Sequence, residues 1–215
     1  MTLTLHYHPL SSYCWKVLIP LYEADVAFEP NLVNLGDPES RARFLTLWPV
    51  GKFPVIETND GQVIAESSSI IEWLALNYPS ARFLVPDDPD TAWEVRRWDR
   101  FLDLHVHSAM QRIIADRLRP ADDKDPTGVS DARRAMAVGL DIAEARMAGR
   151  EFIATDGFTM ADCAAAPALY YADKAAPFGD ARPNLTAYLE RLKARPSFAR
   201  VLEEAVPFFQ YYPSE

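Results

Sequence analysis

The chain has 215 residues, of which 49% are hydrophobic and 25% are charged, and its formal net charge is −9. This composition is typical of a globular protein with one large or two small domains. The negative charge argues against a surface for nucleic acid or anionic membrane, because phosphates are bound by basic side chains. No apolar run approaches the roughly 18 residues of a membrane span. The first residues also lack the basic start and apolar core of a secretory signal. We therefore expect a cytoplasmic protein without nucleic-acid or membrane partners.

The two cysteines, Cys14 and Cys163, are far apart in the sequence. Neither belongs to a C-x-x-C pair or to a spacing typical of metal ligands. We expect no disulfide framework, no dithiol redox site and no metal.

The first part of the chain predicts strands where apolar residues alternate and helices where they recur on one helical face. Asn59-Asp60-Gly61 marks a hairpin, because Asp-Gly readily adopts the positive φ angles of tight turns. The predicted order is β-α-β-α-β-β-α, a thioredoxin-like arrangement. Its elements are strands at 2–7, 27–32, 55–58 and 62–65, and helices at 11–24 (with Pro20 inside), 38–46 and 67–78.

Prolines and acidic residues separate this part from a helical remainder. Tyr78-Pro79 ends the first part, and VPDDPD at 85–90 is typical of a linker. The sequence Thr159-Met-Ala-Asp162 is a capping box, with Phe158 placed for a hydrophobic staple. Helices are predicted at 91–118, 130–148, 161–173, 185–194 and 197–204, with a charged loop at 119–129. We expect an α/β domain at 1–79, a linker at 80–90 and an all-helical domain at 91–215.

The segment 51–71, GKFPVIETNDGQVIAESSSII, contains two features of a ligand site. Phe53-Pro54 opens a strand, where proline is unusual. A cis bond there would turn the preceding N–H and C=O outward toward a ligand. The serines from Ser67 onward begin a helix whose free N–H groups suit a carboxylate. The alternative is a plain hairpin followed by a serine-capped helix.

Ser11-Ser12-Tyr13-Cys14 lies between the first strand and the first helix and offers hydroxyls beside a helix N-terminus. Such hydroxyls can stabilise a thiolate. A free thiol has a pKa near 8.5, and lowering it by about two units requires roughly 2.7 kcal/mol. Simple helix capping is the alternative.

The sequence resembles the cytosolic glutathione transferases, in particular bacterial serine-type members with a zeta-like or theta-like motif. The resemblance is carried by Phe53-Pro54, the hairpin, Glu66-Ser67 and the run LSSYCWKVLIPL. The resemblance covers the whole chain. It implies a thioredoxin-like domain followed by an all-helical domain, with glutathione as co-substrate and no metal. Ser11 falls on the family's catalytic serine and Ser12 follows it. Tyr13 stands where the zeta pattern has cysteine, so which of the three faces the sulfur stays open.

The resemblance also implies a set of glutathione contacts. The backbone of Phe53 would pair with the cysteinyl unit, beside a cis Pro54. Glu66 would receive the γ-glutamyl ammonium and Ser67 its carboxylate. Lys52 would meet the glycyl carboxylate, with a solvated loop lysine as the alternative.

The second substrate would be a small hydrophobic electrophile bound between the two domains. Core packing is the alternative for every side chain expected to line its pocket: Tyr13, Trp98, Leu102, His105 and Met110. His105 and His107 could act as acid or base. The aromatic tail Phe208, Phe209, Tyr211 and Tyr212 would cover the active site or another surface.

The expected activity is transfer of the glutathione thiolate to this electrophile. Glutathione-dependent isomerisation or dehalogenation is an alternative, as is a thiol reductase that uses Cys14. A non-catalytic protein that binds a macromolecular partner is a third. The resemblance also implies a homodimer, built across 60–80 of one chain and 91–115 of the other.

Overall fold

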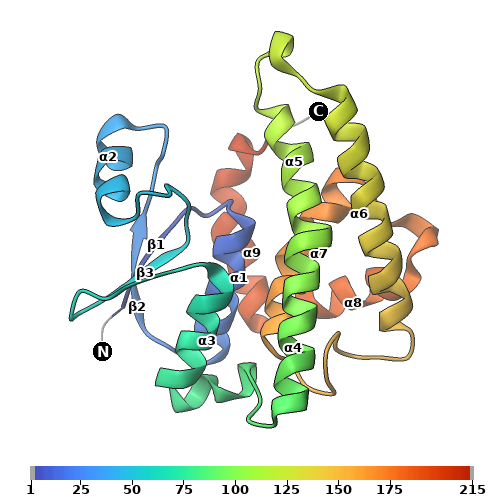
Figure 1. Ribbon diagram of the computed structural model, residues 1–215, viewed down its shortest axis with the longest axis horizontal. Coiled ribbons are helices and arrows are strands. Elements are labelled where there is room, and N and C mark those ends of the chain that lie inside the picture. The colour runs from blue at the N-terminus through green and yellow to red at the C-terminus, as the bar shows by residue number, and fades with distance from the viewer. Residues whose placement is uncertain (1–2, 214–215) are drawn as a thin grey trace.

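The computed structural model describes residues 3–213, so the expected start of the first strand at Thr2 lies outside it. Four strands form one sheet in the order β2-β1-β3-β4 (Figure 1). Strand β1 is parallel to β2 and antiparallel to β3, and β3 pairs with β4 as the predicted hairpin. The strands are β1 (Leu3–Tyr7), β2 (Phe28–Leu32), β3 (Val55–Thr58) and β4 (Val63–Ala65).

Three helices flank the sheet, namely α1 (Ser12–Glu23), α2 (Pro38–Leu47) and α3 (Ser67–Asn77). Helix α1 packs against α3 and against two helices of the second part, α7 and α9. Helix α2 lies apart from the helical part (Figure 1), over a small separate core of Val33, Phe44 and Val55. The order β-α-β-α-β-β-α agrees with the prediction, and the α/β part followed by a helical part confirms the predicted fold class.

After residue 78 the described part of the chain contains helices joined by loops, and no strand. The predicted linker contains a 3-10 helix, η1 (Pro79–Leu84), and the predicted loop before α6 contains another, η3 (Ala121–Asp123). None of the described helices is long and apolar enough to cross a membrane. The remaining elements are α4 (Pro89–Phe101), η2 (Leu102–His107), α5 (Ser108–Arg117), α6 (Pro126–Met147), α7 (Met160–Ala175), η4 (Gly179–Ala181), α8 (Pro183–Lys193), α9 (Pro196–Ala205) and η5 (Val206–Tyr211).

Helix α7 lies at the centre of the helical part and is buried along most of its length. The predicted capping box at its start is confirmed, because the Asp162 carboxylate accepts the Thr159 N–H at 2.8 Å. The same carboxylate accepts the Ile153 N–H at 3.1 Å and the Tyr188 hydroxyl. One continuous core joins α7 to α1. The start of α1 is thereby fixed against the helical part.

The long helix expected at 91–118 is instead two α-helices joined by a π-helical segment, η2. Ser108 closes this wide turn by donating its hydroxyl to the Asp103 carbonyl at 2.7 Å. Helix α6 packs directly on it at Gly139, where a Cβ would stand 2.7 Å from the His105 carbonyl oxygen. π-Helical turns inside α-helices are often found at functional sites.

Candidate active site

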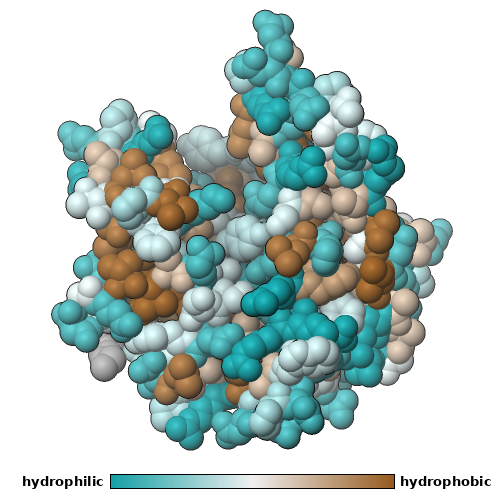
Figure 2. All heavy atoms as spheres, in the orientation of Figure 1, coloured by the Kyte–Doolittle hydropathy of each residue, from teal (hydrophilic) through white to brown (hydrophobic). Residues whose placement is uncertain are grey.

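A cavity of about 270 Å³ lies where the β1–α1 loop faces α5. In Figure 2 the same face of the molecule is hollowed between the lobe that carries α2 and helix α5. The sheet side contributes Ser11, Ser12 and Phe53 to its walls, so the cavity brings the predicted serines and the predicted Phe53 together. Its lining is His8, Leu10, Ser11, Ser12, Phe53, Met110, Gln111, Ile114, Leu118, Tyr171, Tyr211, Tyr212 and Pro213.

Ser11 is the N-cap of α1 and is half-buried. Its Oγ accepts the Cys14 N–H at 3.3 Å, so the capping interpretation of this serine is correct. Capping uses a lone pair and leaves the hydroxyl proton to be donated elsewhere. Ser11 can therefore cap its helix and donate to a ligand sulfur at the same time.

Ser12 is 1% exposed and is held from the other part of the molecule. Its Oγ lies 2.6 Å from His107 Nε2 of η2 and accepts a hydrogen bond of 2.8 Å from Gln111 Nε2 of α5. These bonds join the two parts directly beneath the cavity.

Tyr13 does not line the cavity. Its ring stacks on the His107 imidazole, with the ring centroids 3.8 Å apart and an angle of 18° between the planes. Burial raises the pKa of its phenol, and the charge of Asp103 adds to this effect. Tyr13 therefore does not line the pocket in which we expected it to contact the second substrate.

Cys14 is buried on the inner face of α1. Burial raises the pKa of its thiol to about 12, although hydrogen bonds from Ser11 and His8 oppose the shift. Because the thiolate is the reactive form of cysteine, this environment disfavours the reductase alternative.

Beneath the serines, Lys16 holds a buried cluster of charges. Its Nζ is 2.8 Å from Asp99 Oδ1 and 2.6 Å from Asp103 Oδ2, and it donates to Ser68 Oγ at 2.8 Å. Ser68 in turn donates to Asp99 Oδ2 at 2.7 Å. The lysine is completely buried, so it ties α1 to α3 and α4 through charge as well as packing.

The predicted glutathione contacts lie along the segment from Lys52 to Ser67. The Phe53-Pro54 bond is cis, as expected for this motif. Glu66 is the N-cap of α3 with a positive φ of 67°, and its carboxylate makes no capping bond. Ser67 is 8% exposed at the first position of that helix, whereas Lys52 is exposed.

The residues expected around the second substrate divide into two groups. Met110 lines the cavity, whereas Trp98, Leu102 and His105 do not. Leu102 and Trp98 belong to the hydrophobic core, and the Trp98 indole N–H donates to the Glu94 carboxylate. The His105 ring packs at 5.0 Å on Phe101 instead.

The aromatic tail also divides. Tyr211 and Tyr212 line the cavity. Phe209 packs on Trp15 and Tyr170, and Phe208 borders a different cavity.

Several residues of the site were not anticipated from the sequence: Ser68, Asp99, Asp103, Gln111 and Tyr171. One signal was available. Lys16 stands among apolar residues on the inner face of a helix, and a buried lysine requires acidic partners. The sequence does not say which acids these are.

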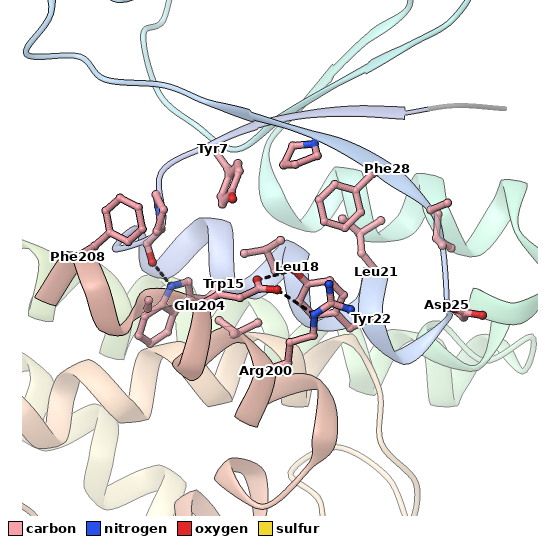
Figure 3. Close-up of a pocket in the computed structure, with 16 residues that line it drawn as sticks. Tyr7, Trp15, Leu18, Leu21, Tyr22, Asp25, Phe28, Arg200, Glu204 and Phe208 are labelled. Carbon is pink, nitrogen blue, oxygen red and sulfur yellow. Dashed lines mark hydrogen bonds and ion pairs between the residues drawn. The ribbon is translucent and has the colours of Figure 1, made fainter.

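A larger cavity, of about 500 Å³, lies on the other side of the β1–α1 loop (Figure 3). Three of its polar side chains pair with one another, since the Glu204 carboxylate accepts from Tyr22 Oη at 2.6 Å and from Arg200 Nε at 2.8 Å. Neither Ser11 nor Ser12 reaches it. The smaller cavity is therefore the one in which the serine hydroxyls can contact a ligand. No group of side chains suited to a metal ion occurs among residues 3–213.

Two family models match the chain. The one described as "Glutathione S-transferase, N-terminal domain" matches residues 5–82, and "Glutathione S-transferase, C-terminal domain" matches residues 101–196. A glutathione S-transferase of Hyoscyamus muticus is 27% identical over 94% of this chain and 99% of its own length.

Solved structures agree with these matches. A glutathione S-transferase of Methylobacterium radiotolerans, in complex with glutathione sulfonate, is 30% identical with a TM-score of 0.82, over 94% of both chains. A glutathione S-transferase of Methylobacillus flagellatus with GSH bound is 27% identical with a TM-score of 0.86, over 93% of this chain and 98% of its own. The present chain belongs to the glutathione S-transferase family.

Proposed function

We propose that this glutathione transferase ionises the thiol of glutathione beside Ser11 and directs the thiolate to a small hydrophobic electrophile. The observation that carries the proposal is the shared cavity, in which the Ser11 cap, Phe53 and apolar side chains of α5 meet. The solved relatives from two bacteria bind glutathione or its sulfonate, which supports the same ligand here.

Glutathione lies along the segment from Phe53 to Ser67 in this proposal. Its cysteinyl unit pairs with the Phe53 backbone beside Pro54. Its γ-glutamyl end meets the Glu66 carboxylate, which no capping bond occupies, and the first turn of α3 at Ser67. Helix N-termini favour carboxylates because their first N–H groups are unpaired. Lys52, which is exposed, meets the glycyl carboxylate at the other end.

Ser11 is the hydroxyl that donates to the sulfur. Ser12 is bonded to His107 and Gln111, and Tyr13 does not line the cavity. A hydrogen bond to the thiolate at a helix N-terminus is of the order needed to lower the pKa of a thiol by about two units.

The electrophile lies against the apolar wall of the same cavity. Met110, Ile114 and Leu118 form one side of it, and Tyr171, Tyr211 and Tyr212 form the other. These side chains offer no charge, which favours an uncharged and largely apolar molecule.

The test combines binding and ionisation. Calorimetry measures binding of reduced glutathione, and the ultraviolet absorbance of the thiolate is followed in the same sample as a function of pH. Ser11→Ala is expected to raise the pKa of bound glutathione by about two units and to lower kcat/KM for a model aromatic electrophile about 100-fold. Ser130→Ala, an exposed serine of α6, is the matched control. Full activity of Ser11→Ala would contradict the assignment.

We also propose a cytoplasmic homodimer. Three large apolar side chains are exposed on α3, α4 and η2, inside the segments expected to pair: Leu76 at 81%, Trp93 at 62% and Leu104 at 58%. Light scattering on wild type and on Trp93→Glu tests this, since a charge at the interface should shift the protein toward monomer. A monomeric wild type would contradict it.

A further inference from the structure

Ser12 begins a line of polar atoms that ends on a buried carboxylate. Its Oγ lies 2.6 Å from His107 Nε2. On the far side of the imidazole, His107 Nδ1 lies 3.7 Å from Asp103 Oδ1. Serine, imidazole and carboxylate thus follow one another in the order of a catalytic triad with a serine nucleophile. Nε2 of the ring faces the serine and Nδ1 faces the carboxylate.

The hydrogen bonds have one consistent direction. The Gln111 amide nitrogen can only donate, so it occupies a lone pair of Ser12 Oγ. His107 Nδ1 and Asp103 Oδ1 are both buried and neither has a hydrogen-bond partner in the described part of the chain. A carboxylate facing Nδ1 favours the tautomer that carries its proton there. Nε2 then keeps its lone pair, and Ser12 donates its proton to it.

The surroundings keep the imidazole neutral and the carboxylate charged. Burial lowers the pKa of His107, although Asp103 opposes this. Burial disfavours the charge on Asp103, yet His107 and Lys16 together lower the pKa of this carboxyl. Lys16 binds Asp103 Oδ2 at 2.6 Å and leaves Oδ1 to the imidazole. Stacking on Tyr13 fixes the plane of the ring.

We propose that Ser12, His107 and Asp103 form a nucleophilic centre that hydrolyses thioesters of glutathione. The proposal rests on the proposed function, because it uses the same bound glutathione. Ser12 lines the cavity beside Ser11 and Phe53. The acyl carbon of such a thioester is one bond from the sulfur, so a sulfur beside Ser11 places that carbon toward the neighbouring Ser12.

The reaction balances with water as the only co-reactant. Ser12 Oγ attacks the acyl carbon and its proton passes to His107 Nε2. The carbon–sulfur bond breaks, and glutathione leaves as a thiolate that Ser11 stabilises and that takes the proton from His107. Water then attacks the acyl-serine and gives a proton to His107, which returns it to Ser12 Oγ. The products are glutathione and a carboxylic acid.

The first turn of α1 supplies donors for the oxyanion formed during both steps. The N–H groups of Ser12 and Tyr13 have no acceptor within the helix, because the first N–H groups of any helix lack one. Donors aimed at developing charge stabilise such intermediates.

The test uses S-acetylglutathione and a fluorophosphonate probe on the full-length protein. Release of thiol from S-acetylglutathione measures hydrolysis, and mass spectrometry of labelled peptides locates the probe. We expect wild type to hydrolyse the thioester and to carry the probe on Ser12. His107→Gln retains a side chain that can donate to Ser12 but provides no base. It should therefore lose hydrolysis about 100-fold or more, together with the labelling.

Conjugation with the model electrophile and thermal unfolding are measured on the same samples, with Ser130→Ala as control. A protein that conjugates glutathione but neither hydrolyses S-acetylglutathione nor labels at Ser12 overturns the inference and leaves the proposed function intact. Hydrolysis unchanged in a folded His107→Gln also overturns it. Hydrolysis through Ser12 without conjugation would support the inference and contradict the proposed function. Labelling of wild type requires no variant, so the test does not depend on a variant that fails to fold.

Discussion

The two serines at the start of α1 are adjacent in sequence but are held by different parts of the molecule. Ser11 makes its hydrogen bond three residues away, to the Cys14 N–H of its own helix. Ser12 bonds to side chains 95 and 99 residues away, in η2 and α5. The comparison shows that the two sides of the site are built in different ways. The sheet side is built from local motifs, and the helical side is built from contacts that exist only after the two parts pack.

Charge distinguishes the same two sides. On the sheet side, the Glu66 carboxylate is exposed and free of capping bonds. On the helical side, Lys16 and Asp99 are buried and Asp103 is partly buried, and each charge depends on the others. We expect substitutions on the helical side to alter stability most, and local substitutions to have small and predictable effects.

Lys16→Met should give the largest change in stability. The substitution leaves the Asp99 and Asp103 carboxylates buried without their cation, which typically costs about 3–5 kcal/mol. The free energy of unfolding from urea titration measures it. Adding Asp99→Asn to Lys16→Met should recover part of the loss, because one buried charge is removed.

Lys193→Met is the control, since Lys193 pairs with Glu190 at the surface and such pairs contribute little. If Lys16→Met and Lys193→Met were equally stable, the buried cluster would not be a source of stability and the contrast between the two sides would fail.

Gly139→Ala should have an intermediate effect on the packing of α6 against the π-turn. Its Cβ would stand 2.7 Å from the His105 carbonyl oxygen, a backbone atom that cannot move alone. Overpacking of this kind typically costs about 1–3 kcal/mol, and here it would also shift His107 away from Ser12. Thermal unfolding and thioester hydrolysis should therefore decline together.

Gly157→Ala is the matched change, because no atom lies within 4 Å of its added Cβ. Its stability should remain close to that of wild type. A neutral Gly139→Ala would show that α6 and the π-turn are not in the close contact described above.

Asp125→Ala should have the smallest effect and tests the local side of the comparison. Its carboxylate accepts the Gly128 N–H at 2.8 Å and caps α6 ahead of Pro126. Loss of such a cap typically costs about 1 kcal/mol. Urea titration measures the change, with Asp122→Ala in the preceding turn as control. A cost of several kcal/mol in the free energy of unfolding would contradict the expectation that this cap acts only within its own helix.

The sequence was informative where a hydrogen bond or a turn closes within a few residues. The element order, the hairpin at Asn59-Asp60-Gly61 and the Thr159–Asp162 capping box were predicted and are present. One local signal was missed, because Asp125-Pro126 begins a helix inside the loop expected at 119–129. Aspartate before proline is a typical helix start, so that error did not require tertiary information.

The sequence could not predict the helical side of the site. A periodic pattern over 91–118 predicts a helix, but it does not reveal the π-turn or the bonds of His107 and Gln111 to Ser12. It also does not reveal that Trp98, Leu102 and His105 lie outside the cavity. The partners of Lys16 lie in α3, α4 and η2 and meet it only when those elements pack on α1.

The sequence by itself therefore determined the order of the elements, the local caps and the family motif, because backbone propensity and short-range hydrogen bonds depend on neighbouring residues. Both serines line the cavity, but tertiary structure alone decided that Ser12 is the one bonded to His107 and Gln111. It also decided which charges share the interior, because burial and long-range contact follow from the way helices pack.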